Sequence, residues 1–155
     1  MGFLCNIKLP MFVSVTRLRV RRFIDLPQFL WKTQFAKGQA RKAPGFLGGK
    51  LLVDAHRAYW TLTAWESEQA MKAYRGSGAH GSVMRKLAEW CDEAAYAHWE
   101  SPGDTVPEWP EAYERLVSSG KLSRVEHPSP AHEARQFAEP RLHPLIGQEL
   151  KPKSR

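Results

Sequence analysis

Cysteine is scarce in this sequence, and so are acidic residues and long apolar runs. Two cysteines, Cys5 and Cys91, among 155 residues are too few for a disulfide framework or a cysteine metal cluster. No apolar run reaches the roughly 20 residues of a membrane helix, and the first ten residues are too weakly patterned for a secretory signal. We therefore expect a cytoplasmic protein without a membrane segment, in which Cys91 is a buried free thiol.

Basic residues outnumber acidic ones by 23 to 16, which gives a net charge of +7. Part of the excess lies in the first predicted strand, at Arg17 and Arg19, and part in the tail, at Lys151, Lys153 and Arg155. We expect a solvated basic surface and a basic tail. A nucleic-acid surface is the weaker alternative, because no zinc finger, helix-turn-helix or RNA-recognition motif accompanies the charge.

The first strand is predicted over 12–20, which is rich in β-branched residues. We expect the face with Arg17 and Arg19 to be solvated, with contacts to acids or to a ligand anion as alternatives. A helix follows, with Asp25 as its cap. Trp31 and Phe35 project away from its apolar stripe, which indicates a second contact with a partner subunit or with the C-terminal extension.

Two further strands are predicted over 46–54 and 58–65. The pair Gly48–Gly49 indicates a bulge or a close backbone approach in the first of them. In the second, Trp60 points to one face, whereas Tyr59 and Trp65 point to the other. Because both faces carry apolar side chains, we expect both to be covered.

A short helix capped by Ser67 is predicted to break near 75–78, and Ser77 is the expected cap of the next helix. The spacing of this next helix predicts one apolar stripe of seven residues: His80, Val83, Met84, Leu87, Trp90, Cys91 and Ala94. A fourth strand over 95–99 follows. His80 thus begins the stripe in the first turn of a helix, where the helix dipole favours a neutral imidazole.

This order of elements, β-α-β-β-α-β, predicts an α+β, ferredoxin-like fold with an antiparallel sheet and its helices on one face. We expect a twofold homodimer to cover the other face, with Tyr59 and Trp65 on it. The chain divides into a flexible N-terminus (1–10, with Met11 as an alternative start), the ferredoxin-like domain (11–100), a C-terminal helix and arm (101–126) and a Pro-rich basic tail (127–155). The tail is expected to dock in places and to be disordered beyond them.

The segments WTLTAWESEQAMKAYRGSGAH and WCDEAAYAHW resemble the antibiotic-biosynthesis-monooxygenase-like group of the dimeric α+β barrel superfamily, in particular its uncharacterised bacterial members. The likeness to spheroidene monooxygenase is more distant and would imply heme. Thr63, Trp65, Ser67 and Tyr74 match the sequence motif that this group carries after its third strand. The resemblance implies a dimeric barrel and an oxidoreductase.

Heme-degrading relatives use an aromatic residue on the short helix and a histidine further along the chain. Tyr74 occupies the first position and Met84 the second, with His80 one turn earlier. The strand-1 asparagine of the relatives has no counterpart, and Ser14 and Thr16 stand nearest to its place. The candidate catalytic residues are therefore His80 and Tyr74, and the candidate ligand-binding residues are Trp60, Trp65, Met84, Ser14 and Thr16.

Two functions follow from these candidates. One is a monooxygenase acting on a flat hydrophobic or phenolic molecule, with His80 as base or heme ligand; no metal site is expected, and heme is a possible cofactor. The other is a non-catalytic homodimer that binds a small ligand or has a structural role. For His80 the alternative to a chemical role is a hydrogen bond that fixes the helix break, and for the aromatic residues it is ordinary core packing.

Overall fold

The computed structural model describes residues 8–141 and 147–154. A ferredoxin-like unit comes first, and a C-terminal extension follows it after Ser101. The elements of the unit are β1 (Met11–Val20), η1 (Phe23–Asp25), α1 (Leu26–Lys42), β2 (Phe46–Val53), β3 (Ala58–Trp65), α2 (Glu68–Arg75), α3 (Gly78–Trp90) and β4 (Cys91–Ser101). Those of the extension are α4 (Trp109–Ser119), β5 (Lys121–Leu122), α5 (Pro130–Glu133) and β6 (Gly147–Leu150).

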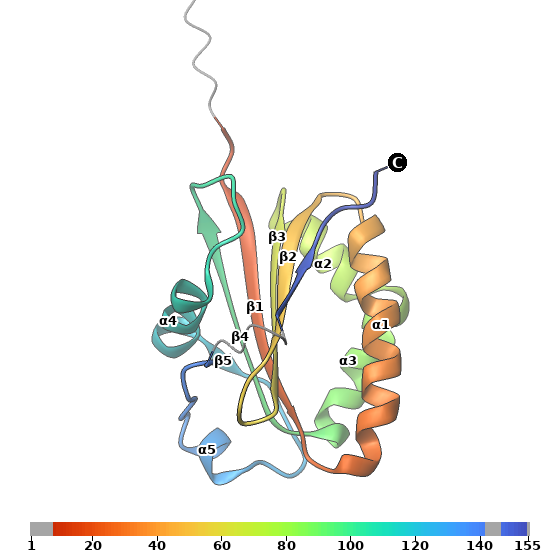
Figure 1. Ribbon diagram of the computed structural model, residues 1–155, viewed down its shortest axis with the longest axis vertical. Coiled ribbons are helices and arrows are strands. Elements are labelled where there is room, and N and C mark those ends of the chain that lie inside the picture. Colours follow the sequence, from red (N-terminus) through yellow and green to blue (C-terminus); the bar gives the residue numbers. More distant parts are fainter. Residues whose placement is uncertain (1–7, 142–146, 155) are drawn as a thin grey trace, which may run out of the picture.

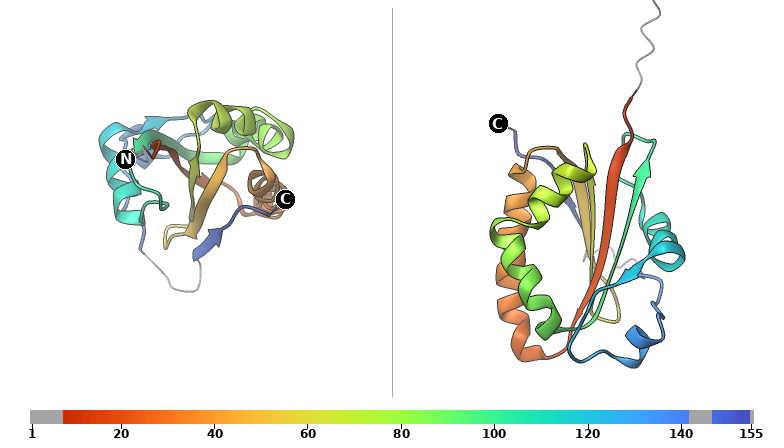
Figure 2. Two further views of the ribbon diagram at one scale, coloured as in Figure 1. Left: turned by 90° about the horizontal axis from the view of Figure 1, so that it is seen from above. Right: turned by 180° about the vertical axis from the view of Figure 1, so that it is seen from behind.

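The described strands form one antiparallel sheet in the order β5-β4-β1-β3-β2-β6. Its four central strands confirm the predicted α+β, ferredoxin-like fold. Helices α1, α2 and α3 cover one face of the sheet, and α4 lies on the opposite face (Figures 1 and 2). None of the described helices is both long and apolar enough to cross a membrane.

The helix side of the sheet holds two small apolar clusters. In one, the ring of Phe29 meets Tyr59 edge-on at 5.0 Å and Trp90 at 6.4 Å. In the other, Trp65 packs with Met71 of α2. The prediction that Tyr59 and Trp65 lie on the sheet face away from the helices is therefore wrong, because both point toward the chain's own helices.

The opposite side of the sheet is covered by the C-terminal extension. Trp109 and Leu116 of α4 are 6% and 1% exposed and pack in one cluster with Val13, Trp60 and Leu62. Both faces are thus covered, as expected, but by a segment of the same chain. The open face that was the reason for expecting a dimer is absent from the described residues. A dimer itself stays a prediction.

The arginines of β1 contact acids, which was an alternative to the solvated face expected from the sequence: Arg17 is buried and Arg19 is partly buried. Arg17 is 3% exposed and donates to the Glu93 carboxylate at 2.5 Å, and Arg19 pairs with Asp92 at 2.7 Å. The predicted helix stripe was too long by one turn, which explains the error. Helix α3 ends at Trp90, so Asp92 and Glu93 belong to β4, directly beside β1.

Cys91 also lies on β4 rather than on the helix, and its thiol is free and buried, as predicted. Burial raises its pKa to about 12, so the thiol is protonated at neutral pH. Two other local predictions are confirmed. The register between β2 and β3 shifts at Gly48, which is the expected bulge, and Ser67 Oγ accepts from the Ala70 N–H at 3.1 Å as a helix cap.

Asp25 precedes α1 as expected, but its side chain caps nothing. The carboxylate instead accepts two hydrogen bonds from the Arg22 guanidinium, at 2.8 and 3.2 Å. In the tail, the docked part includes α5, and Gly147–Leu150 pairs with the edge of β2, a strand that was not predicted. Of the predicted flexible N-terminus, residues 1–7 lie outside the described residues.

Candidate functional site

A cavity of about 470 Å³ lies between the sheet and the helices that cover it. Strands β1 to β4 form its floor, and α1, α2 and α3 form its roof. The apolar part of its wall includes Leu18, Phe29, Leu30, Val83, Met84 and Leu87. The polar part includes Ser14, Thr16, Thr61, Thr63, Tyr96 and His98. A largely apolar cavity with a few polar groups is typical of a small-molecule site.

The alternation of side chains along each strand produces this polar floor. Ser14 and Thr16 of β1 point toward the helices, whereas Val13 and Val15 point into the core on the other side. The short hydroxyl side chains leave space under the helices, while the larger side chains of the other face fill theirs. The cavity therefore results from the short side chains on the helix-facing side of the sheet.

His80 lies in the cavity wall, in the first turn of α3. Its Nδ1 is 3.1 Å from the carbonyl oxygen of Arg75. Because a carbonyl oxygen can only accept, Nδ1 carries the proton and Nε2 carries the lone pair of the neutral ring. Burial and, to a smaller degree, the positive charge of Arg75 lower the pKa of His80, against the opposing effect of the carbonyl bond. The neutral ring agrees with the prediction, although burial is the main cause.

The start of α3 is held by Gln39 of α1, not by Ser77 as predicted. Ser77 occupies the cap position, but its side chain makes no capping hydrogen bond. The Gln39 amide accepts from the His80 N–H at 3.0 Å and donates to the Ser77 carbonyl at 2.8 Å. Gly78, between them, has a φ of +57°, and a Cβ there would lie 2.9 Å from Gln39 Oε1. This contact fixes where His80 enters the cavity.

Tyr74 stands beside His80, with 4.5 Å between the two ring centroids. Its hydroxyl donates to the carbonyl of Ala36 at 3.0 Å, and burial raises its pKa above its usual value. The hydroxyl proton is thus engaged in a hydrogen bond to the backbone of α1. Tyr74 therefore forms a rigid part of the cavity wall. Of the two side chains, His80 is the one with an available lone pair, on Nε2.

The structure brings most of the predicted site residues together. Ser14, Thr16, Tyr74, His80 and Met84 line the cavity. Trp65 does not, because it is fully buried with its ring stacked at 5.1 Å against Tyr74 and its Nε1 donating to Thr63 Oγ1.

Trp60 borders the cavity, but its ring belongs to the other side of the sheet. There its Nε1 donates to the Asp54 carboxylate at 2.8 Å, and the ring meets Trp109 edge-on at 6.5 Å. The ring of Trp60 is therefore engaged in packing on the extension side of the sheet, and a ligand-binding role for Trp60 stays a prediction.

Sequence reasoning missed His98 and Tyr96, which reach the cavity from β4. Their rings are 5.1 Å apart, and Phe12 lies 5.5 Å from His98. Burial, followed by the charge of Arg75, lowers the pKa of His98. The signal was present in the sequence, because Tyr96 and His98 alternate with the small or apolar residues Ala95, Ala97 and Trp99.

No cluster of three or more histidine, cysteine, aspartate or glutamate side chains in residues 8–141 and 147–154 could hold a metal ion.

The family model of a domain of unknown function, DUF3291, matches residues 21–140. The chain belongs to the DUF3291 family. No curated protein matches its sequence. The match includes both the cavity-forming helices and most of the C-terminal extension, so the extension is part of what the family model describes.

Among solved structures, this chain resembles small α+β proteins in fold. A conserved protein from Methanosarcina mazei Go1 has a TM-score of 0.53 and 14% identity, and the match covers 60% of this chain and 94% of that one. A putative antibiotic biosynthesis monooxygenase from Nitrosomonas europaea has a TM-score of 0.51 and 17% identity, with 60% and 89% covered. A mutant of SnoaB, described as a cofactor-independent oxygenase from Streptomyces nogalater, has a TM-score of 0.51 and 16% identity, with 63% and 98% covered. At these identities the likeness shows the antibiotic-monooxygenase-like fold, and about two-fifths of this chain has no counterpart in them.

Proposed function

We propose that this DUF3291 protein is a monooxygenase-type oxidoreductase that acts on a flat hydrophobic or phenolic small molecule in the cavity. The observation that carries the proposal is the neutral ring of His80. Its Nδ1 is fixed on the Arg75 carbonyl, which leaves the Nε2 lone pair as a base at the wall of an apolar cavity. The fold likeness to a putative monooxygenase and to a cofactor-independent oxygenase supports the reaction class.

The reaction can be written for 1-naphthol as a model substrate. His80 Nε2 takes the phenolic proton, and the resulting anion is electron-rich enough to reduce O2. One oxygen atom enters the ring to give 1,4-naphthoquinone, and the other leaves as water together with two hydrogens of the substrate. The substrate supplies all the electrons, so this version needs no external reductant.

The hydroxyl groups of the floor have a matching role. Ser14, Thr16 and Thr61 can donate to the oxygen atoms of the bound molecule, while the ring of Tyr74 and the side chain of Met84 give it an apolar wall. Hydrogen bonds that tighten as negative charge develops on the substrate oxygen favour the anion and lower the barrier.

Heme is the cofactor that the resemblance raises, and the cavity fits it in part. His80 Nε2 is the kind of nitrogen that ligates heme iron, and Lys37 and Arg75 line the same cavity as cations that can meet carboxylates. Bound heme would supply redox chemistry toward O2. The proposal therefore has a cofactor-free form and a heme form, and His80 is central to both.

The test uses purified wild type, His80→Gln and, as a matched control, His56→Gln in the exposed β2–β3 turn. Oxygen uptake with 1-naphthol and with a quinol is expected for wild type and the control, and it should fall about 100-fold in His80→Gln because a general base is lost. Hemin addition with a Soret measurement on the same proteins addresses the heme form. No uptake and no Soret shift in wild type, or equal responses in His80→Gln, would reject the proposal.

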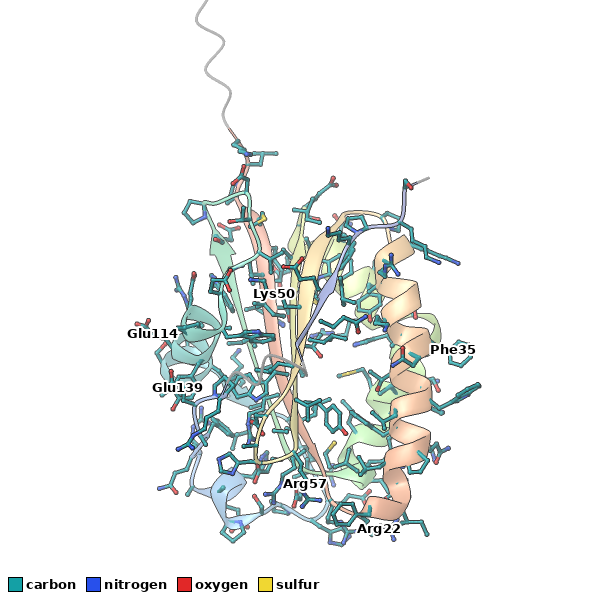
Figure 3. The ribbon with its side chains drawn as sticks, in the orientation of Figure 1. Arg22, Phe35, Lys50, Arg57, Glu114 and Glu139 are labelled. Carbon is teal, nitrogen blue, oxygen red and sulfur yellow. The ribbon has the colours of Figure 1, made fainter. Side chains whose placement is uncertain are left out.

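The alternative is a non-catalytic homodimer, and one observation favours it. Trp31 and Phe35 of α1 are 68% and 55% exposed and lie 5.3 Å apart, and Phe35 points away from the sheet (Figure 3). The covering part of the C-terminal extension lies on the other side of the sheet, which leaves a partner subunit as their predicted contact. The homodimer and the cytoplasmic location stay predictions.

Sedimentation of Trp31→Ala/Phe35→Ala beside wild type tests this alternative. The double variant should dissociate more readily than wild type, whereas Val117→Ala, which changes a 55% exposed residue of α4, should not. A wild type that is monomeric at all concentrations would reject the dimer.

A further inference from the structure

The charge of the cavity wall is of one sign. Two bases, Lys37 of α1 and Arg75 at the end of α2, line the cavity, together with His80 and His98. Of the described residues that line it, none is aspartate or glutamate. The other side chains that line the cavity are uncharged. The positive charges of Lys37 and Arg75 therefore have no acidic counter-ion inside the cavity.

Several basic side chains outside the cavity form ion pairs with acids. Arg17 meets Glu93, Arg19 meets Asp92, Arg22 meets Asp25 and Lys50 meets Glu108, at 2.5 to 2.8 Å. These four basic side chains have acidic partners, whereas Lys37 and Arg75 of the cavity have no ion pair among the described residues.

The partners of the two cavity bases are neutral or absent in the described chain. Lys37 Nζ donates to Gln148 Oε1 of β6 at 3.2 Å, which is a bond between a cation and an amide. For Arg75, the described residues include no ion pair and no side-chain hydrogen bond. Glu68, whose pKa is lowered by its contacts with Lys72 and less by Arg75, bonds Lys72 at 2.8 Å and does not line the cavity.

The positive charge of Arg75 reaches both histidines of the cavity. It lowers the pKa of His80 and of His98, in each case after the larger effect of burial. An anion placed among these groups would be attracted by Arg75 and could accept hydrogen bonds from the hydroxyls of the floor.

We infer that the natural ligand of the cavity is an aromatic acid: a flat apolar ring system that carries an anionic group, which Lys37 and Arg75 hold. This deepens the proposed function and rests on it, since it names the substrate class of the same cavity. An apolar ring alone would satisfy the wall of Leu30, Val83 and Leu87 but would leave both bases without an anionic partner. The carboxylate supplies that partner, and the ring hydroxyl can still face His80.

The experiment compares two compounds that differ by one carboxylate, 1-naphthol and 1-hydroxy-2-naphthoate, by isothermal titration calorimetry. Wild type should bind the acid at least about tenfold more tightly, which is the effect of one charge-assisted hydrogen bond. The preference should shrink at high salt, because ions screen the attraction.

Variants identify the groups responsible. Lys37→Met and Arg75→Met together should remove the preference, so that the double variant binds the two compounds with affinities within about twofold of each other. Arg75→Lys retains the charge and should retain most of the preference. Lys86→Met is the matched control, because Lys86 is half-exposed on α3 and lies outside the cavity wall.

Equal affinity of wild type for the two compounds, or an unchanged preference in a folded double variant, overturns the inference and leaves the proposed function standing. Failure of wild type to bind either compound overturns both. Circular dichroism of each variant shows whether it is folded, and Arg75→Lys provides a conservative variant if Arg75→Met is not.

Discussion

The two faces of the sheet are made by the same strands but differ in how completely they are filled. On the extension side, Trp60, Trp109 and Leu116 are buried, and the charged pair of Arg17 and Glu93 is almost free of solvent. On the helix side, short hydroxyl residues and two histidines border a cavity of about 470 Å³. One face therefore contributes stability and the other provides space for a ligand, and alternate residues of each strand serve each purpose.

The largest effect on stability is expected from removing a large side chain on the extension side of the sheet. Trp109→Ala should destabilise the protein by about 3–5 kcal/mol, because it leaves a large hole between α4 and the sheet. Urea denaturation followed by circular dichroism measures the loss. Trp31→Ala, at a 68% exposed position, is the control and should change stability by about 0.5 kcal/mol or less. Equal losses in the two variants would show that the extension does not complete the core.

A somewhat smaller effect is expected from the charged pair on the same face. Glu93→Gln should cost roughly 3 kcal/mol, because Arg17 would remain buried at 3% exposure without its counter-ion. Glu93 also accepts from Ser129 Oγ at 2.8 Å, so the variant should loosen the arm that carries Ser129. Glu68→Gln, which breaks an exposed pair with Lys72, should cost much less, because water screens the attraction. Similar costs for both would remove the distinction between a buried and a surface pair.

The smallest effect concerns the histidines of the cavity side. Their pKa values in the folded protein lie below the usual 6.5, so the unfolded chain binds more protons on these rings. The stability that they contribute is complete above about pH 6.5 and is lost as the pH falls toward the folded pKa values. Arg75 acts in this direction on both rings, whereas Glu68 raises the pKa of His98.

Proton NMR of the ring C–H signals and urea midpoints at about pH 7.5 and pH 5.5 check this effect. His80→Gln/His98→Gln should lose less stability than wild type between these two values. A wild type whose histidines all titrate at or above 6.5 would contradict the burial of the two rings.

The helix side could be predicted from the sequence far better than the other side. The spacing of His80, Val83 and Met84 predicted their common face, and Ser67 predicted a cap that the structure confirms. Local patterns of this kind are decided by the backbone within one or two turns.

The other side depends on contacts between residues far apart in the sequence, which no local pattern shows. Asp92 and Glu93 continued the helical spacing after Trp90, and only their pairing with Arg19 and Arg17 places them on a strand. The position of α4 over Trp60 is of the same kind. On the helix side the same limit applies to the replacement of the Ser77 cap by Gln39.

The C-terminal extension also supplies both outermost strands of the sheet. Lys121–Leu122 pairs with β4 at one edge, and Gly147–Leu150 pairs with β2 at the other. Without them, β2 and β4 would offer free backbone N–H and C=O groups to any extended chain, the usual starting point of edge-to-edge aggregation. The extension thus protects the folded chain against uncontrolled polymerisation. Removal of the extension should first of all lower the solubility of the protein.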